Sequence, residues 1–159
     1  MTLPILNALT FLAALGSGLI AGLFFAFSTS VMRALGSLPA AQGIAAMKAI
    51  NVSILNLWFG LAFFGTAVVC AAVLILAALS RQTAGADWLI VGALLYLIGS
   101  LGVTMALNVP LNNALAATDP TSDQAETVWA GYLNDWTRWN HVRALASLAA
   151  AGCLTVGLC

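Results

Sequence analysis

Charge is the property that this sequence most clearly lacks. Charged residues make up 6% of the 159 residues and hydrophobic residues 62%, and the mean hydropathy is +1.03. A soluble domain carries far more charge on its surface, so the expected solvent is a bilayer. Residues 1–32, 49–80 and 88–118 contain no charge, and each run exceeds the ~20 apolar residues that a spanning helix needs. We therefore predict an integral membrane protein.

Other absences narrow the function. The five basic and five acidic residues balance, so neither a nucleic-acid footprint nor a polybasic lipid patch is expected. The N-terminal segment lacks the basic residues of a secretory signal, and its apolar run continues past the ~7–15 residues of a signal core, so we expect a retained first span. Phosphate-loop, dinucleotide, haem-attachment and Ser-His-Asp motifs are absent.

Metal and thiol chemistry is poorly supported. Cys70, Cys153 and Cys159 lie in apolar spans without CxxC or Cys/His spacing, so we expect them to behave as small hydrophobic residues. The sequence contains a single histidine, and four of its five acidic residues lie in a polar loop without ligand spacing: Asp119, Asp123, Glu126 and Asp135. We therefore expect no metal and no bound cofactor.

The uncharged runs predict four spans, at residues 5–31, 53–79, 87–108 and 141–159. The fold class is then an all-α integral membrane four-helix bundle, with residues 1–159 forming a single domain. Four spans place both chain ends on one side of the membrane and the polar loops, residues 33–51 and 108–140, on the other. We expect a short amphipathic interfacial helix in each loop. The helix in the second loop follows the break at Asp119-Pro120 and can run straight into the fourth span.

Basic residues favour one orientation of these spans. Arg33, Lys48, Arg138 and Arg143 lie on the long-loop side, whereas Arg81 lies on the other. The positive-inside rule therefore places the long loops in the cytoplasm.

Small residues repeat at four-residue steps in the first span. They are Ala14, Gly18, Gly22, Ala26 and Ser30. Such a stripe lets another helix approach closely. That helix can belong to the same chain or to a second subunit, so a homo-oligomer stays open.

Polar and aromatic side chains gather in one segment, WTRWNHVR at residues 136–143. Trp136, Trp139, Asn140 and Arg143 follow i, i+3, i+4, i+7 spacing and share one helix face, while Arg138 and His141 share a neighbouring face. Asn51, Asn108 and Asn112 are predicted to lie on the same side of the membrane. We therefore expect a polar cluster at one face of the bilayer.

This cluster has more than one interpretation. Tryptophan and tyrosine collect at membrane interfaces, and for Trp129 and Tyr132 a lipid-facing aromatic belt is the better interpretation. The asparagines need hydrogen-bond partners near hydrocarbon, which favours either a structural polar knot between the third and fourth spans or a functional site. His141 carries the imidazole that can transfer a proton near neutral pH, although a lone histidine at a helix start is more often structural.

Four segments resemble a known family. They are FFAFSTSVMRAL (24–35), LPAAQGIAAMKAIN (38–51), NVPLNNAL (108–115) and YLNDWTRWNHVRALASLAA (132–150). The chain is similar over nearly its whole length to the DUF1772 or anthrone-oxygenase-like family of small four-span membrane proteins. Many relatives are bacterial, so the expected location is the bacterial plasma (inner) membrane, as a multi-pass protein.

The resemblance implies oxidation of an anthrone, or of a related lipophilic phenol, by O₂ without metal or flavin. It implies a base, donors for an enolate oxygen, and a dry aromatic pocket, with a lipophilic aromatic molecule and O₂ as partners. The candidates are His141 as the base, Arg143 and Asn140 as oxyanion donors, Trp136 and Trp139 for stacking, and Asn108, Asn112, Arg138 and Asn51 as further substrate contacts.

Whether the chain is an enzyme stays open. The alternative is a non-catalytic small membrane protein that binds a lipophilic ligand or a partner through the same cluster. A channel or transporter is a weaker third option, because the predicted spans carry no charged lining away from their ends.

Overall fold

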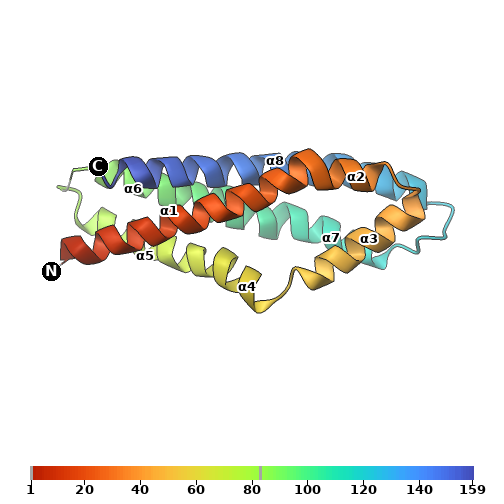
Figure 1. Cartoon of the computed structure of the whole chain (residues 1–159), viewed down its shortest axis with the longest axis horizontal. Coiled ribbons are helices and arrows are strands. Elements are labelled where there is room, and N and C mark those ends of the chain that lie inside the picture. Colours follow the sequence, from red (N-terminus) through yellow and green to blue (C-terminus); the bar gives the residue numbers. More distant parts are fainter. Residues whose placement is uncertain (1, 83) are drawn as a thin grey trace.

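The computed structural model describes residues 2–82 and 84–159, and this part consists of helices joined by short connections (Figure 1). Several long helices contain π-helical segments, labelled η. In chain order the elements are α1 (Thr2–Ala26), η1 (Phe27–Val31), α2 (Met32–Gly36), α3 (Ala40–Ser53), α4 (Leu57–Gly60), η2 (Leu61–Gly65), α5 (Thr66–Leu79), α6 (Ala86–Leu94), η3 (Leu95–Gly102), η4 (Thr104–Asn108), α7 (Val109–Ala117) and α8 (Ala125–Val156).

The long helices pack side by side along their length. α1 contacts α8 and α5, and α6 contacts the same two helices from the other side. The start of α1 and the end of α8 lie at one end of the molecule, and α2, α3 and α7 lie at the other (Figure 1). We call the second end the loop end. The predicted polar residues of α8 lie between the middle of the molecule and this end.

Three of the four predicted spans are confirmed as long apolar helices. The continuous helices Pro4–Gly36, Leu57–Leu79 and Ala86–Ala117 are long and apolar enough to cross a bilayer, which indicates a membrane protein. The first and third continue beyond the predicted ends at residues 31 and 108, the third across Pro110. Residues 141–156 of the fourth predicted span lie in α8, which does not belong to this apolar group. Its crossing of the membrane stays a prediction.

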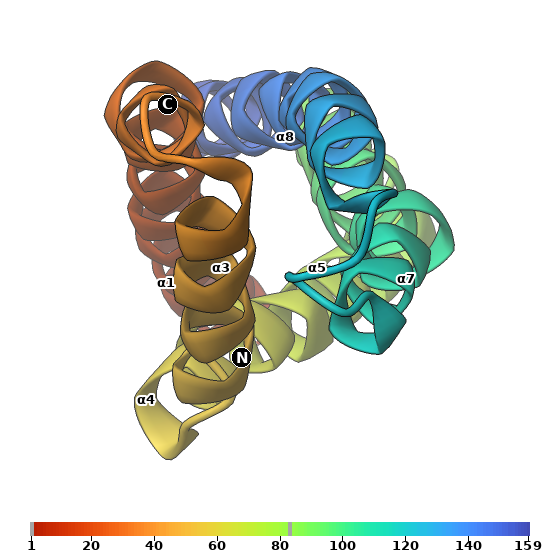
Figure 2. The same ribbon diagram turned by 90° about the vertical axis from the view of Figure 1, so that its right-hand side faces the viewer.

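The two predicted interfacial helices have different outcomes. α3 forms and lies at the loop end (Figure 2), but it turns Gly43, Ile44 and Met47 into the protein interior. The helix contacts α7 and α8. No separate short helix follows the third span, so that prediction is wrong. α7 continues the third span, and α8 runs unbroken from Ala125 to Val156. The alternative expectation, that the second loop's helix runs straight into the predicted fourth span, is confirmed.

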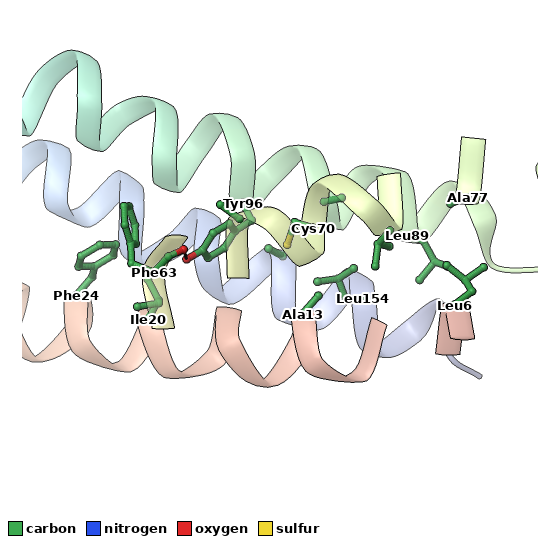
Figure 3. Close-up of a cluster of buried hydrophobic side chains, with 14 of the residues drawn as sticks. Leu6, Ala13, Ile20, Phe24, Phe63, Cys70, Ala77, Leu89, Tyr96 and Leu154 are labelled. Atoms are coloured by element: carbon green, nitrogen blue, oxygen red, sulfur yellow. Dashed lines mark hydrogen bonds between the residues drawn. The ribbon is translucent and has the colours of Figure 1, made fainter. Parts of the chain in front are cut away.

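The main core fills the space between the long helices. Figure 3 shows side chains from α1, α5, α6 and α8 meeting there. The Phe63 ring stacks on Phe59 at 5.3 Å and meets Phe24 edge-on at 6.2 Å. The Tyr96 hydroxyl donates to the Phe63 carbonyl at 3.0 Å. Phe63 lies in η2 and Tyr96 in η3, so two π-helical segments meet at this hydrogen bond.

The small-residue stripe of the first long helix faces away from this core except at Ala14, which packs against it. A side chain added at Gly18 or Gly22 would meet no atom within 4 Å, and Ala26 and Ser30 are exposed. α1 packs inside the chain through its other face. Within residues 2–82 and 84–159, no helix of the same chain packs on Gly18 and Gly22, so that alternative is wrong. A second subunit or lipid would cover these two glycines.

Candidate functional site

The side chains of α8 that point into the bundle form the inner cluster. Asn140 is 0% exposed, Arg143 is 4% exposed, and Trp136 is also buried. Their spacing of four and three residues places them on one side of the helix. Thr104 and Asn108, one turn apart in η4, face them from the third long helix. The cluster thus joins the polar residues of two helices, as the asparagine pattern predicts.

Asn140 connects three parts of the chain through its side-chain amide. Its Nδ2 donates to the Phe24 carbonyl oxygen and to Ser28 Oγ, each at 2.7 Å. Its Oδ1 accepts from an amine nitrogen of Arg143 at 2.6 Å. The orientation of this amide is chemically fixed, because a carbonyl can only accept and a guanidinium can only donate. The amide therefore holds η1 against α8.

Arg143 is a buried cation with neutral neighbours. Besides Asn140, its guanidinium donates to Thr104 Oγ1 at 3.2 Å. Its central carbon lies 4.1 Å from the Phe24 ring centroid and 5.0 Å from that of Trp136. The faces of aromatic rings attract a cation, most strongly when water is excluded. A buried charge without an anionic partner still costs several kcal/mol, on the order of the cost of breaking a buried ion pair. Electronegative ligand atoms would be stabilised nearby.

Three polar atoms of the inner cluster have no hydrogen-bond partner among the described residues. They are Arg143 Nε, Asn108 Oδ1 and Trp136 Nε1. Asn108 uses its Nδ2 to donate to the Trp136 carbonyl at 3.2 Å. Buried polar groups are nearly always paired, so each exception needs an explanation. A further polar group that accepts from the two nitrogens and donates to the Asn108 oxygen would satisfy all three atoms.

A second site, the outer groove, lies on a neighbouring face of the same stretch of α8. It is an open groove of about 460 Å³ between α8 and the η1–α2 segment. Its lining residues are Ser28, Met32, Arg33, Leu133, Asn134, Thr137, Arg138 and His141. The lining includes two arginines and the histidine but no acidic residue. The groove therefore has the electrostatic character of a site for an electron-rich or anionic group.

The predicted catalytic residues divide between these two sites. Asn140 and Arg143 belong to the inner cluster, whereas His141 is exposed and lines the outer groove. His141 and Arg143 are two positions apart, and such residues do not face each other on a helix. The structure therefore does not bring the three together at one place. Ser28, which lines the groove and accepts from Asn140, connects the two sites.

The predicted substrate contacts are also distributed. Trp136 and Asn108 join the inner cluster, and Arg138 lines the outer groove. Trp139 is half-buried, and the guanidinium carbon of Arg138 lies 5.4 Å from its ring centroid. Trp139 therefore lies beside the groove without lining it.

Asn112 and Asn51 meet at a third place, the hydroxyl of Tyr132. This hydroxyl donates to Asn112 Oδ1 at 2.8 Å. Burial raises the pKa of the Tyr132 phenol, and interactions with Asn51 and Arg143 offset part of that effect. The phenol therefore stays protonated and serves as a donor. The hydrogen bond of Asn112 ties α7 to α8.

The aromatic-belt interpretation of Trp129 and Tyr132 is wrong. Each is 4% exposed, and their rings stack at 5.7 Å, with Trp136 continuing the stack at 6.2 Å. α3 covers them, and Gly43 gives the Trp129 indole the room to approach. These rings are a second hydrophobic core at the loop end.

The sequence pattern missed part of the outer groove. Asn134 is four residues from Arg138, and Thr137 is four residues from His141, so helical spacing could have found them. Ser28 and Arg33 come from η1 and α2, and no local pattern links them to α8. Within the described residues, no group of three or more His, Cys, Asp or Glu side chains is placed to hold a metal ion.

Comparison with known proteins identifies the family. No match is found among curated proteins or solved structures. The sequence model of the family described as anthrone oxygenase matches residues 55–153, which is more than half of the chain. The match spans the third long helix and most of α8, and so includes Asn108, Asn140, His141 and Arg143. The chain belongs to the anthrone oxygenase family.

Proposed function

We propose that the protein is a membrane oxygenase that oxidises an anthrone-like or other lipophilic phenolic or polycyclic aromatic substrate with O₂ in the outer groove. Membership of the family supports an oxygenase-type role. The observation that carries the proposal is the groove lining, which combines His141 with Arg33 and Arg138 and contains no acidic residue. A volume of about 460 Å³ falls within the range of ~300–1,000 Å³ common for small-molecule sites.

The groove residues suit the first step of such an oxidation. His141 would remove a proton from the acidic ring CH₂ of the substrate, which leaves an enolate whose charge lies on carbon and oxygen. Arg33 and Arg138 would stabilise that charge electrostatically. Met32 and Leu133 supply the apolar contacts of the groove. They take the role that the sequence suggested for Trp136 and Trp139, whose rings do not line it.

The remaining steps balance with O₂ as the oxidant. The carbanion carbon bonds to O₂ and gives a peroxide anion, which takes up a proton. Removal of the second hydrogen from the same carbon then breaks the O–O bond, releases water and leaves a carbonyl group. His141, which holds the first proton, can supply the proton that the peroxide needs and accept the second one.

The inner cluster would act from behind the groove. Asn140 contacts Ser28, Arg143 contacts Asn140, and neither of the two lines the groove. Their charge and hydrogen bonds would reach the substrate oxygen through Ser28. Asn108, from the third long helix, would complete the inner cluster.

One observation favours the non-catalytic alternative. Asn140 joins α8 to α1 and η1, and Arg143 joins α8 to η4. The same hydrogen bonds are expected if the polar cluster only holds the helices together. In that case the groove would bind a lipophilic aromatic molecule without turnover.

The membrane arrangement belongs to the same proposal. α8 has 32 residues and extends about 48 Å, well beyond the ~30 Å apolar layer of a bilayer. Its C-terminal half would form the fourth span of a four-helix bundle in the bacterial plasma membrane, with the loop end in the cytoplasm. The groove would then lie at the membrane surface, where a lipophilic substrate can enter. A second copy could pack on the outward Gly18/Gly22 stripe.

Oxygen uptake tests the function directly. Purified protein in lipid nanodiscs should consume O₂ when anthrone is added, at a rate above that of empty nanodiscs. Without O₂, it should exchange the CH₂ hydrogens of anthrone for deuterium from D₂O. Binding of anthrone with neither uptake nor exchange would establish the non-catalytic alternative instead.

A further inference from the structure

The hydroxyl of Ser28 is in an unusual position for a helical serine. Serine and threonine hydroxyls inside helices commonly donate to the carbonyl four residues earlier. Thr29, next to Ser28, does so to the Phe25 carbonyl at 2.8 Å. The same bond is made by Thr104, Thr118 and Thr155. For Ser28 the corresponding acceptor is the carbonyl of Phe24.

Asn140 occupies that acceptor. Its Nδ2 donates to the Phe24 carbonyl at 2.7 Å and also to Ser28 Oγ at 2.7 Å. Ser28 Oγ therefore accepts a hydrogen bond from the side where it would otherwise donate. Among the described residues, its own hydrogen donates to no acceptor. Because Ser28 lines the outer groove, the groove is where this hydrogen can find one.

Arg143 fixes this arrangement. Its guanidinium donates to Asn140 Oδ1 at 2.6 Å, so the amide cannot turn over and present its oxygen to Ser28. The chain of bonds from Arg143 through Asn140 to Ser28 runs in one direction, and each donor in it polarises the next. A buried cation thus makes the Ser28 hydroxyl a stronger donor.

We propose that Ser28 is a preset hydrogen-bond donor of the outer groove, directed at the carbonyl or enolate oxygen of a flat aromatic ligand, and that Asn140 and Arg143 are its positioning residues. The assignment rests on the proposed function in one respect, namely that the groove holds the aromatic substrate. It adds a selection rule. A polycyclic molecule with a ring oxygen is bound in preference to the hydrocarbon of the same shape.

Equilibrium binding of a matched ligand pair tests this rule without turnover. Anthraquinone and anthracene share three fused rings, and anthraquinone alone carries carbonyl oxygens. Quenching of tryptophan fluorescence measures binding of each to the protein in nanodiscs, with empty nanodiscs as the blank. The wild type should prefer anthraquinone, and Ser28→Ala should lower its affinity for anthraquinone by about 3–10-fold, the effect of one neutral hydrogen bond. Anthracene binding should not change.

Three further variants distinguish the loss of the hydroxyl donor from a change in the shape of the groove. Ser28→Thr keeps a hydroxyl and should keep the preference. Thr29→Ala removes a neighbouring hydroxyl that does not line the groove and should leave both affinities unchanged. Asn140→Asp cannot donate, so the Ser28 hydrogen should turn to the new carboxylate and the preference should be lost although Ser28 is intact. Thermal unfolding checks that this variant folds, and Ser28→Ala decides the result if it does not.

The outcomes distinguish this inference from the oxygenase proposal. Equal effects of Ser28→Ala on both ligands, or no effect on either, would overturn the donor assignment even if the protein consumes O₂. The protein could instead show a Ser28-dependent preference for anthraquinone while it neither consumes O₂ nor exchanges the anthrone hydrogens. That result would support Ser28 as the donor and contradict the oxygenase proposal.

Discussion

The guanidinium carbon of Arg143 lies 4.1 Å from the centroid of the Phe24 ring, so a buried cation in α8 rests on an aromatic face from α1. The same phenylalanine offers its main-chain carbonyl to Asn140. One residue of α1 thus contacts both polar partners through two different parts of its structure. Asn140 and Arg143 should therefore act as a unit in stability as well as in function.

A double-mutant cycle measures the coupling free energy between Asn140 and Arg143. Asn140→Leu removes an acceptor from the buried guanidinium and should lower the free energy of unfolding by about 1–3 kcal/mol. Arg143→Met removes the buried charge with little loss of volume, and such replacements are often close to neutral. The double variant should be less destabilised than the sum of the two, with a coupling of about 0.5–3 kcal/mol. Denaturation in detergent measures all three, and additive effects would contradict the unit.

His141 should be needed for chemistry but not for folding. It is exposed and lines the outer groove, outside both buried cores. His141→Gln should lower anthrone-dependent O₂ uptake by about 10²–10⁴-fold, the usual contribution of a general base. The unfolding temperature should not change. Arg81→Gln, which alters an exposed basic residue at the opposite end of the molecule, is the matched control. Full uptake by His141→Gln would remove this residue as the base.

Gly43 should be required by the loop-end core. A Cβ atom at this position would lie 2.6 Å from two carbons of the Trp129 indole. Gly43→Ala should therefore cost about 1–3 kcal/mol of stability, as overpacking usually does. Gly131→Ala is the control, because a Cβ atom there meets nothing within 4 Å and alanine favours a helix. Equal unfolding temperatures for the two variants would mean that α3 does not cover Trp129.

The fourth span can be tested by labelling single cysteines. In a background without the native cysteines, Ser37→Cys and Ser122→Cys report on the loop end, and Gln82→Cys reports on the opposite end. A fourth variant keeps Cys159 as its single cysteine. All three positions are exposed, as is the native Cys159. A membrane-impermeant maleimide should label positions 37 and 122 from one side and positions 82 and 159 from the other. Labelling of Cys159 from the same side as position 122 would show that α8 does not cross the membrane.

Helical spacing predicted the part of the site that lies on one helix. Trp136, Asn140 and Arg143 share a buried face of α8, as their positions require. Trp139, which the spacing places on the same face, is half-buried and packs against Arg138 instead. The same spacing separated His141 from them, and the structure places His141 in a different site. Local pattern is sufficient here because every residue concerned belongs to one regular element.

Contacts between distant segments were beyond such a pattern. Ser28 and Asn140 are separated by 112 positions, and nothing near either residue indicates their hydrogen bond. Trp129 has the composition of an interfacial residue, and its burial depends on Gly43 in α3. The residue type indicates only a preference for the membrane interface. Whether the ring faces lipid or the protein core depends on the segments that pack against it.

The π-helical segment η1 sets the rotational phase of everything that follows it in the first long helix. Each π turn contains about one residue more than an α turn, so it advances the next side chains around the axis by roughly 100°. Phe24 precedes the segment and faces the inner cluster, whereas Met32 and Arg33 follow it and line the outer groove. Deletion of a single residue within η1 would restore a regular helix and rotate Arg33 away from the groove. A length change of one residue would thus separate the two sites without altering any side chain that forms them.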